Sequence, residues 1–174
     1  MPTKTRAFKI FLFFLLAILI LGLLLPGSQQ IPVEGASKND WHPDTFWFEP
    51  WGRSGVHKGI DIFADNGTPV AASTGGLVMF AGEWPMGGRV VLVLGPKWRI
   101  HYYAHLSEDP LTDQFWVSQG DRLGGVGATG NAIGKAPHLH YSVVTLLPYF
   151  WLMSSETQGW KKAFFLNPED YFSN

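Results

Sequence analysis

The hydrophobic residues follow two different patterns along the chain. Positions 10–25 form one uncharged apolar run, IFLFFLLAILILGLLL, which follows three basic residues and ends at Pro26. Beyond residue 44, apolar residues come in short runs separated by turns rich in Gly, Pro and Asn. A long apolar run is typical of a helix, whereas short runs bounded by turn residues are typical of strands. The pattern therefore predicts an N-terminal hydrophobic helix followed by a β domain.

The apolar run has the features of an export segment. At about 1.5 Å per residue it is about 24 Å long as a helix, slightly short for a hydrocarbon core of ~30 Å. It is also slightly long for a signal-peptide core of roughly 7–15 residues. Because no close pair of small residues offers a cleavage site, we expect residues 1–25 to be a signal-anchor with the rest of the chain outside the membrane. A cleaved signal peptide, and hence secretion, is the alternative.

The remainder of the chain is expected to hold a linker and one domain. Positions 26–44 are polar with Pro and Gly, which is typical of a linker, and positions 45–174 form the predicted domain. No internal repeat is found, and no segment after residue 26 has a useful helical period. The strand spacing predicts an all-β fold, an antiparallel sandwich or open barrel. The predicted strands are Lys58–Phe63, Val70–Ala72, Leu77–Ala81, Val90–Leu94, Ile100–His105 and His138–Val144.

Composition limits the chemistry. With 13 Lys and Arg against 14 Asp and Glu, and no long basic run, there is no reason to expect a nucleic-acid partner. Cysteine is absent, which excludes a disulfide framework, a Cys-type zinc finger, an iron–sulfur cluster and a thiol nucleophile. Any metal ion must therefore be held by histidines and carboxylates.

Two short segments combine such groups. His57 and Asp61 lie four positions apart, and His138 and His140 flank Leu139. On an extended strand, residues two and four positions apart point to the same face. Two imidazoles separated by one apolar residue rarely face a hydrophobic core together. A catalytic zinc ion takes three protein ligands, for which imidazoles and a carboxylate are suitable, and leaves one position for water.

A third segment adds further imidazoles. By the same spacing rule, His101, Tyr103 and His105 are expected on one face of a strand. Imidazoles near a metal site can take and return protons near neutral pH. We expect His101 and His42 to be structural or surface residues.

Three motifs in this order resemble the M23 metallopeptidases, the lysostaphin- and LytM-like family of peptidoglycan endopeptidases. They are HxxxD at 57–61, YAHLS at 103–107 and TGN…PHLHY at 129–141. The connecting segments also occur in the family's order, so that the resemblance covers about residues 48–144. It implies a zinc-dependent endopeptidase that hydrolyses peptide stems or cross-bridges of peptidoglycan, with one Zn²⁺ per domain.

The resemblance also implies residue roles. His57, Asp61 and His140 match the family's zinc ligands, the second histidine of the HxH pair being the ligand. His105 and His138 match the two catalytic histidines that do not bind the metal. All five positions carry the residues that active members require.

The chain departs from the family pattern at three places near the groove. The segment 121–127 is about five residues shorter than usual, Ala136 replaces a glycine, and Ser142 replaces a common acidic residue. None is a proposed ligand, but each is expected to reshape the groove. Two other functions remain open: a non-enzymatic envelope regulator that activates amidases, as some family relatives do, and a secreted protease that acts on proteins.

Two further sequence features bear on ligands and partners. Positions 125–130 match GxGxxG, but Gly134 and Pro137 prevent the helix that a dinucleotide site needs, so we interpret them as a glycine-rich turn. The apolar stretch Leu146–Met153, within the unassigned segment Thr145–Trp160, is expected to contact a membrane or a partner, because large apolar patches mark interaction sites.

Overall fold

The computed structural model describes residues 4–172, so the ends of the predicted anchor and domain, 1–3 and 173–174, lie outside the described residues. One long helix, α1, spans Lys4–Leu24 and is followed by nine strands and six short 3₁₀ helices. The strands are β1 (Ile60–Phe63), β2 (Pro69–Ala71), β3 (Gly76–Trp84), β4 (Gly88–Gly95), β5 (Arg99–Leu106), β6 (Trp116–Val117), β7 (Arg122–Gly125), β8 (His138–Thr145) and β9 (Phe165–Leu166). The 3₁₀ helices are η1 (Gly52–Ser54), η2 (Pro96–Trp98), η3 (Gly130–Ala132), η4 (Phe150–Leu152), η5 (Gly159–Ala163) and η6 (Pro168–Tyr171).

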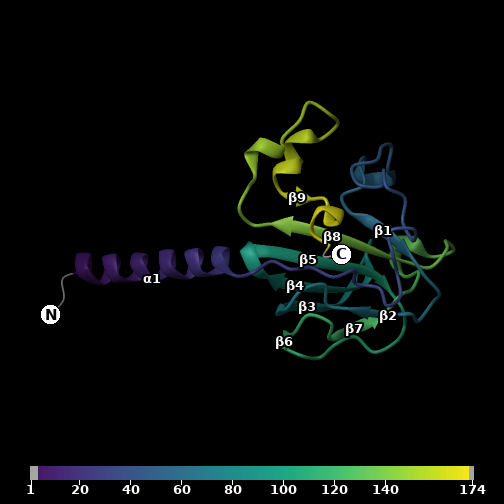
Figure 1. Cartoon of the computed structure of the whole chain (residues 1–174), viewed down its shortest axis with the longest axis horizontal. Helices are drawn as coiled ribbons and strands as arrows, with labels where there is room; N and C mark the ends of the chain where they lie inside the picture. Colours follow the sequence, from purple (N-terminus) through teal and green to yellow (C-terminus); the bar gives the residue numbers. More distant parts are fainter. Residues whose placement is uncertain (1–3, 173–174) are drawn as a thin grey trace.

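The strands form an open antiparallel sheet. Its order is β1-β8-β5-β4-β3-β6, with β9 paired to β8, while β2 and β7 form a separate two-stranded sheet (Figure 1). Each pairing within both sheets is antiparallel. The sheet is not closed, as expected for a sandwich or open barrel. All six predicted strands are present, and the short strands β6, β7 and β9 were not predicted.

The core lies between the large sheet and the small one. Fully buried side chains from the large sheet, such as Val91, Tyr103 and Leu139, share one cluster with Val70 of β2 and Leu123 of β7. Along each strand these residues alternate with residues that face the opposite side of the sheet, as the pleat requires. One face of the large sheet is therefore buried in the core, and the other face is available to form a groove.

The segment 26–44, where we expected a linker, connects α1 to the sheet and packs on the domain over much of its length. Gln29, Val33 and Trp41 are buried. The backbone amide of Gln30 donates to Ser73 O at 2.9 Å, and that of Glu34 donates to Pro69 O at 3.0 Å. The residues directly after α1 and much of the stretch 34–40 are exposed, and the others pack on the domain.

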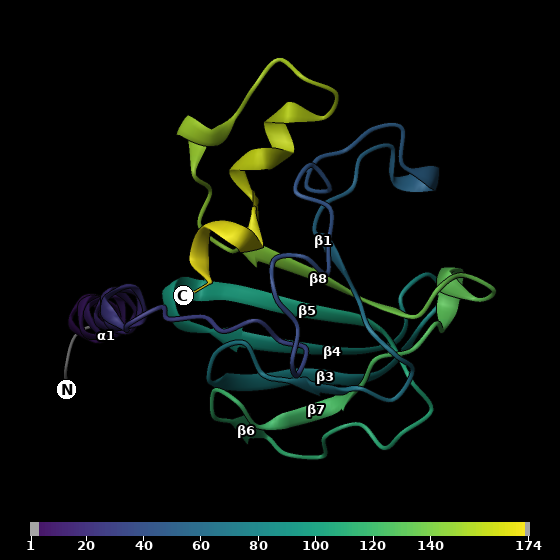
Figure 2. The same ribbon diagram turned by 45° about the vertical axis from the view of Figure 1, so that its right-hand side comes forward.

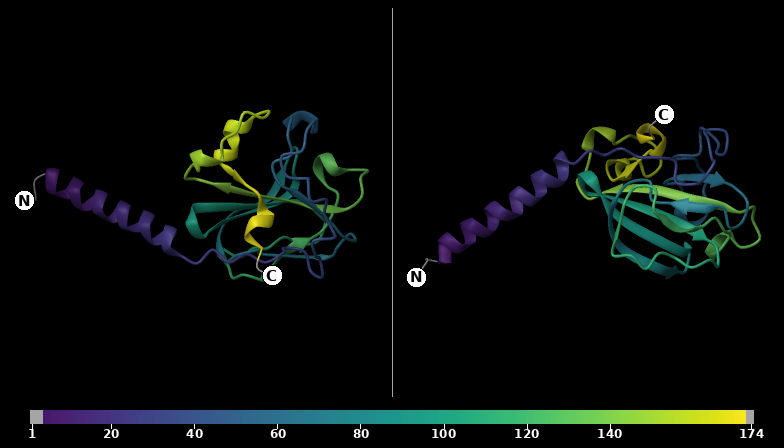
Figure 3. Two further views of the ribbon diagram at one scale, coloured as in Figure 1. Left: turned by 45° about the horizontal axis from the view of Figure 1, so that its top comes forward. Right: turned by 60° about the horizontal axis from the view of Figure 1, so that its bottom comes forward.

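Most of helix α1 extends away from the β domain, and none of its side chains is buried (Figures 1 and 2). Its C-terminal end contacts the domain at η2. It is the only helix among the described residues that is long and apolar enough to cross a membrane. Two further views in Figure 3 show it leaving the domain at one end of the large sheet. An N-terminal hydrophobic helix is therefore confirmed as a structural element.

Candidate metal centre and active site

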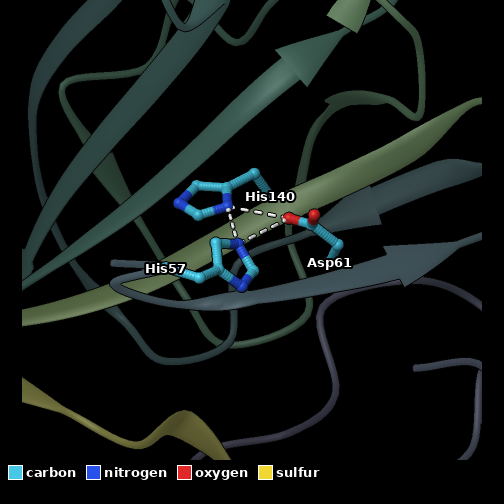
Figure 4. A group of neighbouring side chains, drawn as sticks. All are labelled: His57, Asp61 and His140. Atoms are coloured by element: carbon cyan, nitrogen blue, oxygen red, sulfur yellow. Dashed lines mark hydrogen bonds and ion pairs between the residues drawn. The ribbon is translucent and has the colours of Figure 1, made fainter. Parts of the chain in front are cut away.

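The pairing of β1 with β8 brings three predicted ligands together. Asp61 lies directly opposite His140 in the antiparallel register. Asp61 Oδ1 is 2.8 Å from His140 Nδ1 and 3.1 Å from His57 Nε2, and the two nitrogens are 2.9 Å apart. Figure 4 shows the three side chains pointing toward one another from separate segments. These atoms are close enough to share one metal ion.

His57 reaches the group from a loop. We expected a strand that begins at Lys58, directly after it, but β1 begins at Ile60. The side chain is buried and stacks on Trp51, with ring centroids 4.1 Å apart. Its Nδ1 lies 2.9 Å from the backbone oxygen of Thr45. Because a carbonyl oxygen only accepts, Nδ1 carries the proton and the lone pair of Nε2 faces the other two ligands.

The opposite tautomer holds for His140. Ser142 Oγ donates its proton to Lys58 O at 2.6 Å, and the same oxygen lies 3.0 Å from His140 Nε2. The hydroxyl therefore accepts from Nε2–H, and the lone pair of His140 is on Nδ1. Such outer partners fix the orientation of metal-binding histidines. Ser142, a departure from the family pattern, thus has a defined role in the structure.

Three acceptor atoms consequently converge without a donor between them. The carboxyl group of Asp61 is ionised at neutral pH and offers only acceptor atoms. Burial, opposed by Asp61, lowers the pKa of His140, so that its imidazole is neutral. Lone pairs this close repel one another unless a cation lies among them. The donor set of two neutral imidazoles and one carboxylate fits a zinc-type ion.

The two other histidines lie beside this group. His138 Nδ1 lies 2.8 Å from Ala136 O, and His105 Nδ1 lies 2.9 Å from Thr129 O. Each ring therefore donates Nδ1–H to the backbone, which leaves Nε2 as a base. Their ring centroids are 5.1 Å apart, and His138 Nε2 is 3.9 Å from Asp61 Oδ2. Burial, with smaller contributions from His140 and His138, lowers the pKa of His105 to about 4.

The expectation for the strand 100–105 was wrong in one respect. His101 and Tyr103 are buried toward the core, and His101 Nδ1 lies 2.6 Å from the phenolic oxygen of Tyr141. A register shift between Arg89 and Val91 and the positive φ of 63° at His105 interrupt the alternation. His105 therefore turns to the groove face, and the spacing rule fails because it assumes an unbroken pleat.

A cavity of about 360 Å³ opens over the site. Three cationic side chains line it, Arg53, Lys58 and Lys135, together with Tyr102, whose pKa burial raises to about 12. A second cavity of about 170 Å³ adjoins it and is lined by Asp61 among others. Sequence patterns did not indicate the cationic residues, because Lys58 and Lys135 occupy unspecified positions within the motifs and Arg53 lies outside them.

The unassigned segment Thr145–Trp160 supports one wall of this cavity. Gln158 Nε2 donates to Ser54 O at 2.8 Å, and Trp47 Nε1 donates to Thr157 O at 3.1 Å. These contacts hold the loop that carries Arg53. The glycine-rich stretch 125–130 ends β7 and leads into the three-residue η3, so the structure gives it no dinucleotide-type helix.

Fold and site together define a metallopeptidase-like β domain, and comparisons with known proteins identify the family. The model of peptidase family M23 matches residues 55–147, which is more than half of the chain. The chain therefore belongs to peptidase family M23.

Individual relatives agree with this assignment. The cell division protein DipM of Caulobacter vibrioides is 34% identical over 122 residues, 68% of this chain and 20% of that protein. The peptidoglycan DD-endopeptidase ShyA of Vibrio cholerae is 35% identical over 92 residues, 53% of this chain and 21% of that protein. The chain thus spans about a fifth of the length of these relatives.

A solved structure has the same fold. The catalytic domain of lysostaphin from Staphylococcus simulans superposes with a TM-score of 0.54 at 30% identity, covering 61% of this chain and 81% of that one. The resemblance to the lysostaphin- and LytM-like family seen in the sequence is confirmed.

Proposed function

We propose that this protein is a zinc-dependent metalloendopeptidase that hydrolyses peptide bonds in peptidoglycan. The observation that carries the proposal is the convergence of three acceptor atoms, from His57, Asp61 and His140, whose tautomers and charge leave only lone pairs facing one another. A divalent cation removes that repulsion, and the ligand set suits Zn²⁺. Membership of a peptidase family supports the same chemistry.

The roles of the side chains follow from their hydrogen bonds. A bound zinc ion supplies a Lewis acid that polarises a carbonyl oxygen and acidifies water. In His105 and His138 the basic lone pair is on Nε2, since each Nδ1–H is held by the backbone. As neutral imidazole, His105 can accept a proton from water and pass it to the leaving amine. His138, beside the ligand Asp61, is placed to donate a hydrogen bond to the developing oxyanion when protonated.

The groove suits a peptide that carries carboxylates. Arg53, Lys58 and Lys135 line the 360 Å³ cavity, and none of its lining residues is acidic. Cationic side chains of this kind bind carboxylates by charge-assisted hydrogen bonds. Relatives bear the names peptidoglycan DD-endopeptidase and L-Ala–D-Glu endopeptidase, which are consistent with stem peptides as substrates.

The same proposal includes a location at the outer face of the membrane. Helix α1 has the length and the apolar composition of a membrane anchor. Three basic residues precede its uncharged part and favour an orientation with that end in the cytoplasm. The β domain would then meet peptidoglycan outside the membrane.

The decisive experiment is digestion of purified peptidoglycan by the full chain, followed by mass analysis of the fragments. We expect stoichiometric zinc in the purified protein and release of muropeptides that a chelator stops and added Zn²⁺ restores. Casein, digested in parallel, tests a general protease. Zinc binding without any hydrolysis would contradict the enzymatic proposal and leave the amidase-activating regulator.

A further inference from the structure

The end of the large sheet that lies away from the metal centre is rich in exposed apolar side chains. Phe115 is 78% exposed, Trp116 60% and Trp151 77%. The register places Trp116 opposite Leu77, and Leu77 opposite Leu94, at the start of β3 and the end of β4. The strands β6, β3 and β4 therefore contribute to the same end of the sheet.

Strands β5 and β8 contribute to the same end of the sheet. Gly95 lies opposite Arg99, and Arg99 lies opposite Thr145, where β8 ends. The amide of Leu146 then donates to Trp98 O at 2.9 Å, so the apolar stretch after β8 begins beside η2. We name the set Trp98, Phe115, Trp116, Leu146, Phe150 and Trp151 the aromatic edge.

Helix α1 ends at the aromatic edge. Trp98 Nε1 donates to Leu19 O at 2.9 Å, and Lys97 Nζ donates to Leu23 O at 3.3 Å. An apolar cavity of about 540 Å³ lies between the end of the helix and the sheet and is lined by Leu25, Leu77, Trp98 and Trp116 among others. Figure 1 shows the helix leaving the domain at this end.

The connection between helix and domain is short. The helix ends at Leu24, and Gln29 is already buried in the domain. Even when fully extended, the chain between these two residues spans at most about 18 Å. A domain attached in this way stays close to whatever surface the helix enters.

We propose that the aromatic edge rests in the interfacial region of the bilayer that α1 spans. The inference rests on the anchoring part of the proposed function, and it commits to lipid as the occupant of the edge. Tryptophan side chains favour this region because the ring is apolar and its N–H is polar. Lys97 extends along the apolar surface with its ammonium group at the polar boundary.

Contact between the aromatic edge and the bilayer would set the distance of the active site from the membrane. Strand β5 runs from Arg99, beside the aromatic edge, to His105 in the groove. Six steps of about 3.3 Å place the two ends about 20 Å apart. The metal centre therefore opens about 20 Å from the lipid-facing edge, and the enzyme reaches the peptidoglycan nearest the membrane without a long tether.

The test uses the full chain in vesicles of phosphatidylethanolamine and phosphatidylglycerol. Since the protein has no cysteine, one introduced cysteine carries a single environment-sensitive fluorophore. The labelled variants are Phe115→Cys and Trp151→Cys, and the matched control is Ile133→Cys, which is 77% exposed in the turn after η3, near the catalytic end. Spin-labelled lipids are added as quenchers.

We expect lipid quenching of the labels at 115 and 151 to exceed that at 133 by at least about two-fold. Equal quenching at all three positions would overturn docking, as would protection of the edge labels by an envelope protein but not by lipid. Co-flotation with the vesicles reports anchoring separately, and muropeptide release reports the peptidase separately. If the protein co-floats with vesicles and releases muropeptides but all three labels are quenched equally, only the contact between the aromatic edge and lipid is refuted.

Discussion

The two ends of the large sheet are built in opposite ways. At the catalytic end, His57, His105 and His138 are buried, and each imidazole has a backbone hydrogen bond that sets its tautomer. At the aromatic edge, Phe115 and Trp151 are apolar and largely exposed. Buried polar groups are costly unless they are paired, and large exposed apolar groups mark contact with another phase or molecule. In our two proposals, the first end carries out the chemistry and the second contacts the membrane.

The largest expected effect concerns the catalytic end and separates ligands from proton carriers. His57→Ala, Asp61→Ala and His140→Ala each remove one of three converging atoms, and we expect loss of zinc and hydrolysis at background. His105→Ala and His138→Ala leave those atoms in place, and we expect full zinc content with activity lower by roughly 10²–10⁴-fold. Metal analysis of the purified variants and muropeptide release give the two readouts.

Equal loss of zinc in both groups would contradict the assignment of roles. Full zinc content in all five variants would instead place the metal elsewhere. The two readouts thus test the ligand set independently of the reaction.

The next largest effect concerns Ser142, whose hydroxyl group sets the tautomer of His140. Ser142→Ala removes the acceptor of His140 Nε2–H. Loss of such an outer partner typically costs about 10–100-fold in metal affinity or activity. Zinc competition against a chelating dye measures the affinity, and Ser142→Thr, which keeps the hydroxyl, is the control. Unchanged zinc affinity in the alanine variant would contradict a role for Ser142 in positioning His140.

Sequence patterns selected three residues that the structure brings together, because the family motifs carry them. The HxxxD and HxH segments also share a physical basis, since β1 and β8 pair directly and bring Asp61 opposite His140. Six strands were predicted because their apolar runs are bounded by Gly, Pro and Asn, whereas β7, with the sequence RLGG, has no apolar run. The two-residue strands β6 and β9 are too short to show any period.

Features that depend on tertiary context could not be predicted. The side-chain direction of His105 depends on a register shift against β4 and a positive φ, which no spacing rule contains. The role of Ser142 depends on Lys58 O, which lies 84 positions earlier in the chain. The packing of Val33 and Trp41 on the domain is equally invisible in a polar, Pro-containing segment.

A third effect lies between the two ends, at His101 in β5. Burial, with a smaller contribution from Arg99, lowers the pKa of His101 to about 3. The unfolded chain therefore takes up a proton below pH ~6.5 while the folded protein does not, and stability falls as the pH drops. Between pH 6.5 and 5 this amounts to about 1–2 kcal/mol.

Chemical denaturation at both pH values measures this loss. His101→Gln should remove the His101 share of the loss, since glutamine does not titrate, while the share from His105 and His140, whose pKa values are also lowered by burial, remains. His42→Gln, at an exposed position, is the control. An identical pH dependence in the wild type and His101→Gln would show that His101 is not the group responsible.

The smallest expected effect completes the comparison of the two ends. Phe115→Ser and Trp151→Ser change side chains that lie on the aromatic edge, at the far end of β5 from His105. Substitutions at such separations act independently, so we expect kcat/KM against a soluble muropeptide in detergent to stay within about two-fold of the wild type. Tyr102→Ala, which changes a residue lining the catalytic cavity, serves as the positive control and should lower it. A ten-fold loss for Trp151→Ser in detergent would mean that the edge contributes to substrate binding, and the division between a catalytic end and an attachment end would no longer hold.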